Sequence, residues 1–121
     1  MKNKREIKFR AWDGKYMQKD EFYVDSDGDV LILNSTDYNE GRLVYVDWKL
    51  MQYTGICDKY DKEIYEGDIV RFNSFDDLKI KTGIVNFADG SFRITVDDYF
   101  HAYRWIDYDC EIIGNIYEKN D

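Results

Sequence analysis

The sequence predicts a mainly β fold with little helix. Apolar residues recur at every second position over short runs, which is the period of a half-buried strand and not that of a helix. Clusters of Gly, Asp, Asn and Ser separate these runs, and no segment keeps helical periodicity over three turns. Seven to nine short strands in 121 residues favour a small barrel or sandwich over an α/β fold.

Two hairpins are predicted in the first third of the chain. Residues 7–12 (IKFRAW) alternate as a strand, residues 13–15 (DGK) form a turn, and the return strand begins at Tyr16. The second hairpin pairs residues 22–24 with residues 30–33 across the Asp/Gly loop DSDGD.

The next predicted strand covers residues 42–48 (RLVYVDW). Leu43 and Tyr45 alternate with Val44 and Val46, so both faces of the strand are apolar. A strand that is apolar on both faces is typical of one buried on both sides. We therefore expect both faces of this strand to be covered.

The C-terminal half is predicted to be a small SH3-like barrel. Residues 67–70 (GDIV) open a strand, and Gly83 and Val85 supply the G-x-V pattern that such barrels often carry on the following strand. Two short helical turns are also expected, one at residues 50–53 and one in residues 97–105 (DDYFHAYRW), where Asp97 or Asp98 would cap the turn. The predicted strands of the barrel are residues 69–72, 82–87, 91–96 and 112–117.

The predicted organisation has two parts. Residues 1–49 form an N-terminal β-hairpin region, and residues 50–121 form the β-barrel core. A single continuous domain over residues 1–121 is the alternative, because the length suits one domain.

The charge balance makes several partners unfavourable. Lys plus Arg number 17 and Asp plus Glu number 25, for a net charge of -8, which repels phosphate backbones and anionic membranes. Residues 20–41 hold acidic residues and no Lys or Arg, which predicts a solvated acidic loop region or a surface that imitates nucleic acid. Two cysteines make no disulfide framework, and no run is apolar and long enough for a membrane helix, so we expect a cytoplasmic protein.

The loop DSDGD has the start of a calcium-loop pattern. Asp25, Asp27 and Asp29 follow the alternate spacing of an EF-hand, but its later Gly and Glu positions hold Val30 and Thr36. The sequence therefore predicts a solvated turn and no metal site.

No catalytic or cofactor site is predicted. His101 is the single histidine, and two cysteines are too few for a structural zinc finger. Cys57 and His101 are the types needed for a nucleophile and its base, but nothing in their sequence context supports that pairing. The chain is therefore predicted not to be an enzyme and to need no cofactor.

Three segments together resemble one known family. They are residues 7–13 (IKFRAWD), residues 50–70 (LMQYTGICDKYDKEIYEGDIV) and residues 112–118 (IIGNIYE), and in this order they resemble the YopX family of phage and prophage proteins. The resemblance implies a mainly β, phage-borne protein that acts in the cytoplasm of a bacterial host and has no established catalytic residues. Cys57 and Tyr60 depart from the residue types that the family more often has there.

The central segment, residues 50–70, is interpreted as a structural element. Its turn residues and its Gly-Asp strand opening explain the pattern without a ligand. A surface role for Tyr53, Asp58, Asp61 or Tyr65 is the alternative.

Three hypotheses about function follow from the charge balance, the lack of catalytic motifs and the family resemblance. The first hypothesis is a non-enzymatic protein-interaction module that binds a host or phage protein and also forms homo-oligomers. The alternatives are an acidic, DNA-mimic-like inhibitor of a host nucleic-acid-binding protein, and a small nucleic-acid-binding β-barrel that uses the basic N-terminal region. The predicted interaction residues are Trp12, Tyr53, Tyr65, Tyr103 and Trp105.

Overall fold

The computed structural model describes residues 6–34, 41–73, 79–96 and 109–118, together with the backbone of residues 101–103. These residues are mainly β and contain no helix, so none of them forms a helix that could cross a membrane. The chain divides into a smaller unit, Phe9–Met51, and a larger unit formed by Met1–Lys8 and Gln52–Asp121. The division predicted from the sequence, residues 1–49 and 50–121, stays a prediction.

The smaller unit holds a hairpin and a three-stranded sheet. Strands β1 (Phe9–Trp12) and β2 (Met17–Gln18) form the hairpin. Its turn is fixed by Asp13, whose carboxylate accepts the backbone N–H groups of residues 15 and 16 at 2.7 Å each. Strands β3 (Tyr23–Val24), β4 (Val30–Asn34) and β5 (Arg42–Val46) form an antiparallel sheet in that order.

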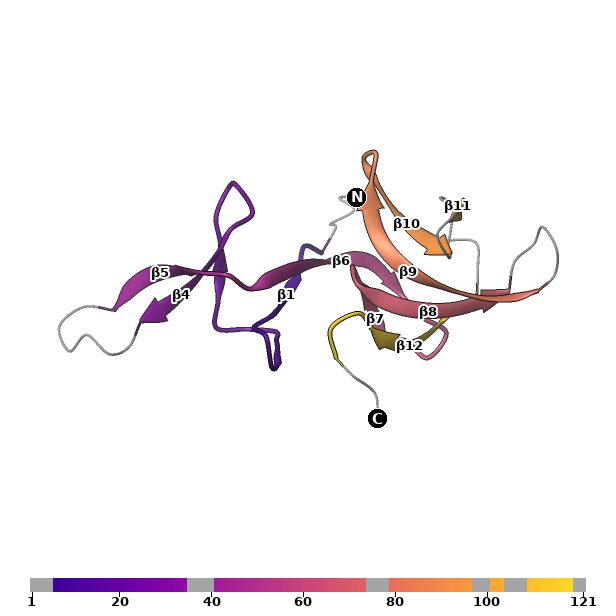
Figure 1. Ribbon diagram of the computed structural model, residues 1–121, viewed down its shortest axis with the longest axis horizontal. Helices are drawn as coiled ribbons and strands as arrows, with labels where there is room; N and C mark the ends of the chain where they lie inside the picture. The colour runs from indigo at the N-terminus through magenta and orange to yellow at the C-terminus, as the bar shows by residue number, and fades with distance from the viewer. Residues whose placement is uncertain (1–5, 35–40, 74–78, 97–100, 104–108, 119–121) are drawn as a thin grey trace, which may run out of the picture. The chain divides into compact units, whose positions relative to one another are not determined.

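The larger unit is built on a five-stranded antiparallel sheet in the order β11-β10-β9-β8-β12 (Figure 1). Its strands are β8 (Asp68–Asn73), β9 (Ile80–Ala88), β10 (Ser91–Val96), β11 (His101–Tyr103) and β12 (Glu111–Asn115). One face of the sheet carries the core of this unit, because alternate side chains of each strand point the same way. The buried members are Ile64, Val70, Phe72, Val85, Ile94 and Cys110.

Gly83 lets two strands of this sheet approach closely. A Cβ at this position would lie 2.4 Å from the Cγ2 atom of Ile94 and 2.9 Å from the backbone oxygen of Thr95, both on β10. Only glycine fits there without moving β10. The G-x-V pattern of the sequence therefore marks a packing requirement between β9 and β10.

The central segment folds around a buried carboxylate. Strand β6 (Lys49–Cys57) ends just before Asp58, and strand β7 (Glu63–Tyr65) begins after the turn. The Asp58 side chain accepts the backbone N–H groups of Tyr60 and Lys62, both at 2.9 Å, and that of Ile112 at 3.0 Å. One carboxylate thus shapes the turn and ties it to β12.

A second buried carboxylate sets the opening of β8. Asp68 is 2% exposed and accepts the backbone N–H of Tyr65 at 2.8 Å. Gly67 before it has a φ of 87°, donates its N–H to the oxygen of Val85 and accepts the N–H of Ile116. The Gly-Asp pair therefore joins β7, β8, β9 and the end of β12.

Two local predictions were wrong. Residues 50–53 were expected to form a short turn, but they lie within β6. A helical turn was expected in residues 97–105, but His101–Tyr103 form β11, which pairs with residues 94–96 of β10. Pairing with a sheet neighbour decides the conformation of residues 101–103. The rest of that segment lies outside the described residues.

Candidate interaction surface

The three-stranded sheet of the smaller unit presents an apolar face. Its register sets Leu31 opposite Tyr23 on one side and Tyr45 on the other, and sets Leu33 opposite Leu43. Because residues directly opposite each other on paired strands share a face, these five side chains form one continuous patch. We call these five residues the apolar sheet face.

The apolar sheet face is open to solvent. Tyr23 is 55% exposed, Leu33 53%, Leu43 51% and Tyr45 66%, while Leu31 is half-buried between them. None of the five side chains is charged. The largest contiguous apolar patch on a protein surface is often a binding site.

The other face of the same sheet is largely buried. Val30 on β4 is 2% exposed, and Ile32, Val44 and Val46 on the same side are partly buried. The prediction that β5 is covered on both faces was therefore wrong for the side that carries Leu43 and Tyr45. The prediction was made because both alternating positions of β5 are apolar. Only one of its two faces is buried in the structure.

Gly41 shapes the edge of the apolar sheet face. A Cβ at this position would lie 2.6 Å from the Cδ1 atom of Leu33. The bare glycine backbone lets the Leu33 side chain lie across the start of β5. Leu33 and Leu43, which lie opposite each other, thus form the apolar end of this face.

An acidic turn borders the other end of the sheet. One oxygen of Asp25 accepts the N–H groups of Asp27 at 3.0 Å and Asp29 at 2.9 Å, and the second accepts the hydroxyl of Tyr45 at 3.0 Å. The hydrogen bond from Asp29 is the main cause that lowers the pKa of Asp25. The carboxylates of Asp25, Asp27 and Asp29 lie within 4.8 Å of one another, but Asp25 already accepts these bonds from its own turn. The geometry is that of a solvated hairpin turn.

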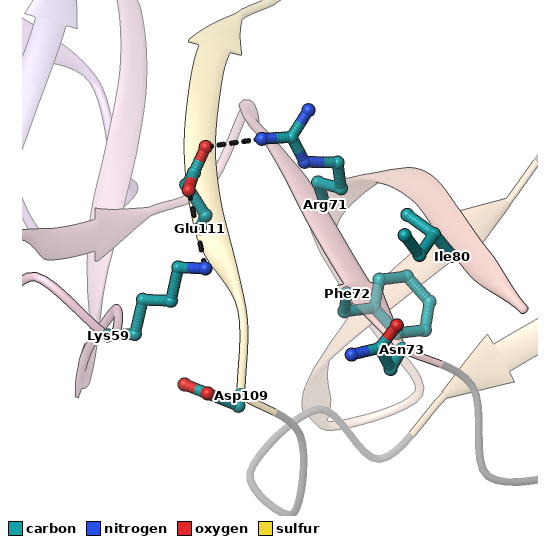
Figure 2. Close-up of a pocket in the computed structure, with 7 residues that line it drawn as sticks. All are labelled: Lys59, Arg71, Phe72, Asn73, Ile80, Asp109 and Glu111. Carbon is teal, nitrogen blue, oxygen red and sulfur yellow. Dashed lines mark hydrogen bonds and ion pairs between the residues drawn. The ribbon is translucent and has the colours of Figure 1, made fainter. Parts of the chain in front are cut away.

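A small polar hollow lies in the larger unit, between β8, β12 and the turn after β6. Its volume is about 90 Å³, and Glu111 lies in it between Arg71 at 2.7 Å and Lys59 at 3.5 Å (Figure 2). Both cations are already paired with this carboxylate. The geometry is therefore not that of a binding site for an added anion. The residues that line it are Lys59, Arg71, Phe72, Asn73, Ile80, Asp109 and Glu111.

The family model described as YopX protein matches residues 8–121. The chain belongs to the YopX family. YopX from Bacillus subtilis, solved by X-ray crystallography, is 29% identical with a TM-score of 0.58, and the match covers 91% of this chain and 92% of that one. Protein EF1440 from Enterococcus faecalis shares the fold at 24% identity and a TM-score of 0.59, over 94% of this chain and 95% of that one. A search of curated proteins found no match to this chain.

Two of the predicted interaction residues of this YopX family protein meet in its interior. Tyr53 and Tyr65 are 8% and 7% exposed, and their ring centroids are 5.5 Å apart. Burial, helped by a contact with the Cys57 sulfur at 3.7 Å, raises the pKa of Tyr53 to about 12. The ammonium group of Lys8 lies 5.6 Å from the Tyr53 ring centroid. These contacts give both tyrosines a packing role.

The other three predicted residues are Trp12, Tyr103 and Trp105. Trp12 ends β1 in the smaller unit and is half-buried. Tyr103 belongs to β11, where only its backbone is described, and Trp105 lies outside the described residues. The interaction role of all five predicted residues stays a prediction.

The cysteine and histidine side chains form no described site. Cys57 is a partly buried free thiol and Cys110 a buried one. Burial is the main cause that raises the pKa of Cys110, which keeps this thiol protonated and unreactive. His101 lies in β11, and its side chain is outside the description. None of the four exposed residues of the apolar sheet face was predicted as an interaction residue, although the sequences of β4 and β5 are apolar at both alternating positions.

Proposed function

We propose that this YopX family protein is a non-enzymatic accessory protein of a phage or prophage, and that it works by binding another protein. The observation that carries the proposal is the apolar sheet face, with four of its five large side chains at least half exposed. The phage origin and a location in the cytoplasm of a bacterial host rest on the family.

The chemistry of the face suits a protein partner. Tyrosine and leucine side chains anchored on a sheet give a wide contact area with little loss of side-chain freedom on binding. The net charge of -8 works against nucleic acid and anionic membranes as partners. An uncharged face on an acidic protein therefore favours a partner that is held by apolar contact.

An acidic inhibitor of a host nucleic-acid-binding protein is the second candidate. It is favoured by the turn that gathers the carboxylates of Asp25, Asp27 and Asp29 within 4.8 Å of one another. Binding through these charges would weaken steeply as salt is added, whereas binding through the apolar sheet face would not.

We also propose that the larger unit is a small SH3-like barrel. The support is its five antiparallel strands in the order β11-β10-β9-β8-β12 and the close approach of β9 and β10 at Gly83. In this arrangement the larger unit is the scaffold, and the smaller unit carries the contact surface.

The test is a pull-down from host lysate with two matched variants. Leu33→Gln/Leu43→Gln makes the apolar sheet face polar, and Ile80→Gln/Ile116→Gln makes the same chemical change at exposed sites of the larger unit, 70% and 48% exposed. We expect a nuclease-resistant partner that the wild type and the control retain and the face variant loses. Equal retention by all three proteins, or retention that nuclease abolishes, would contradict the proposal.

A further inference from the structure

We propose that the occupant of the apolar sheet face is a second copy of this chain, packed face to face about a two-fold axis. The inference rests on the proposed function, because it takes this face to be the contact surface. A two-fold contact uses the same patch on both copies, so a single exposed patch is enough to build it.

The area of the face suits a dimer. The exposed fractions of Tyr23, Leu33, Leu43 and Tyr45, which lie between 51% and 66%, correspond to roughly 400 Å² of side-chain surface. Two copies would bury roughly 800 Å² from these side chains alone, and the rim of each sheet would take the total to about 1,000 Å², where specific interfaces begin.

The chemistry of the face allows a dry contact between identical copies. None of its five side chains is charged, so the two copies bring no like charges together at the centre despite the net charge of -8. The Tyr45 hydroxyl already donates to Asp25 at 3.0 Å. Packing a second sheet over Tyr45 therefore leaves the hydroxyl hydrogen of Tyr45 paired.

The acidic turn selects one of the two ways to stack the sheets. The turn that holds Asp27 and Asp29 lies at one end of the strands, and the pair formed by Asn34 and Arg42 lies at the other. A two-fold axis along the strands would set the two acidic turns beside each other. An axis across the strands keeps the two acidic turns apart, at opposite ends of the stacked sheets.

Sedimentation equilibrium of the full chain tests the inference directly. The monomer mass is 14.6 kDa, and we expect the wild type to approach twice this mass as its concentration rises through the micromolar range. Leu33→Gln/Leu43→Gln should weaken association at least ~100-fold, because four leucines leave the interface of the dimer. Ile80→Gln/Ile116→Gln, which lies outside this face, should associate like the wild type.

Two results would overturn the inference. One is a wild type that stays monomeric at every concentration, and the other is a dimer that survives Leu33→Gln/Leu43→Gln, since its contact would lie elsewhere. If a monomeric wild type still retains a lysate protein through Leu33 and Leu43, the proposed function stands and only the second copy is wrong. If no partner depends on these leucines and no dimer forms, both fail.

Discussion

Replacing Asp58 should destabilise the larger unit by several kcal/mol. The carboxylate is 7% exposed and accepts three backbone N–H groups at 2.9, 2.9 and 3.0 Å. A hydrogen bond to a charged group contributes about 1.5–3 kcal/mol, and a buried donor left unpaired costs a similar amount. Because Tyr60 and Lys62 lie in an exposed turn where water can replace the carboxylate, we expect Asp58→Ala to lower the free energy of unfolding by about 4 kcal/mol.

Asp58→Asn should cost less, about 2 kcal/mol, because an amide oxygen can still accept the bonds from residues 60 and 62 while its NH2 group opposes the N–H of Ile112. Asp61→Asn is the matched control. Asp61 is an exposed acid of the same turn with a φ of 67°, a conformation that asparagine tolerates well. We expect this control to unfold like the wild type.

The same carboxylate gives the stability a defined pH dependence. Burial alone would raise the pKa of Asp58, but the hydrogen bonds from Ile112, Lys62 and Tyr60 outweigh it and hold the pKa below its ordinary value of 3.8. A lowered folded-state pKa means that this contribution is fully present above about pH 5 and is lost as the pH falls through the folded-state value. Asp58→Asn removes the titrating group and should flatten this part of the profile.

Urea unfolding followed by far-UV circular dichroism, repeated at several pH values, measures both effects. Amide hydrogen exchange at Ile112 adds a local measurement, since its N–H should lose protection in both Asp58 variants. The reasoning is refuted if Asp58→Asn unfolds at the same urea concentration as the wild type at neutral pH, or if Asp61→Asn is equally destabilised.

Two further substitutions test the packing of the larger unit. Gly83→Ala should lower the urea midpoint by an amount equivalent to about 1–3 kcal/mol, because the new methyl group would meet Ile94 and the backbone of Thr95; an unchanged midpoint would show that β10 yields freely. Asp68→Ala should cost about 1–3 kcal/mol, because the N–H of Tyr65 loses a buried acceptor, and Asp68→Asn should cost less. Equal losses for the two Asp68 variants in thermal unfolding would contradict that account.

The strands were predictable because alternation and turn chemistry are local. The apolar run of residues 30–33 and the Asp/Gly turn before it predicted the β3–β4 hairpin. The alternation of residues 7–12 predicted β1. The hydrogen bond from Ile112 to Asp58 joins residues 54 positions apart, so no local pattern could reveal that Asp58 is buried. The sequence could indicate a local backbone bond for Asp68, but not the long-range role of Asp58.

The contact surface was harder to predict because burial depends on which face the fold covers. Both alternating positions of β5 are apolar, and the sequence does not say that Val44 is turned inward and Tyr45 outward. Tyr53 was predicted as an interaction residue but is buried against Tyr65, because the irregular pairing of β6 with β7 between Tyr53 and Cys57 fixes which side chains point inward. Aromatic content marks candidates, and pairing register decides which of them face solvent.

Hydroxyl-radical footprinting of the wild type, read residue by residue, tests most directly whether the apolar sheet face is the contact surface. In dilute protein, Tyr23, Leu33, Leu43 and Tyr45 should each be oxidised at the rate expected for an exposed side chain of its own type, as should Tyr60, which is 62% exposed in the larger unit. As the concentration rises, or when a host lysate is added, these four side chains should become protected while Tyr60 stays reactive. Four side chains whose oxidation rates do not change under any condition, or that are protected equally at every concentration, would contradict the account.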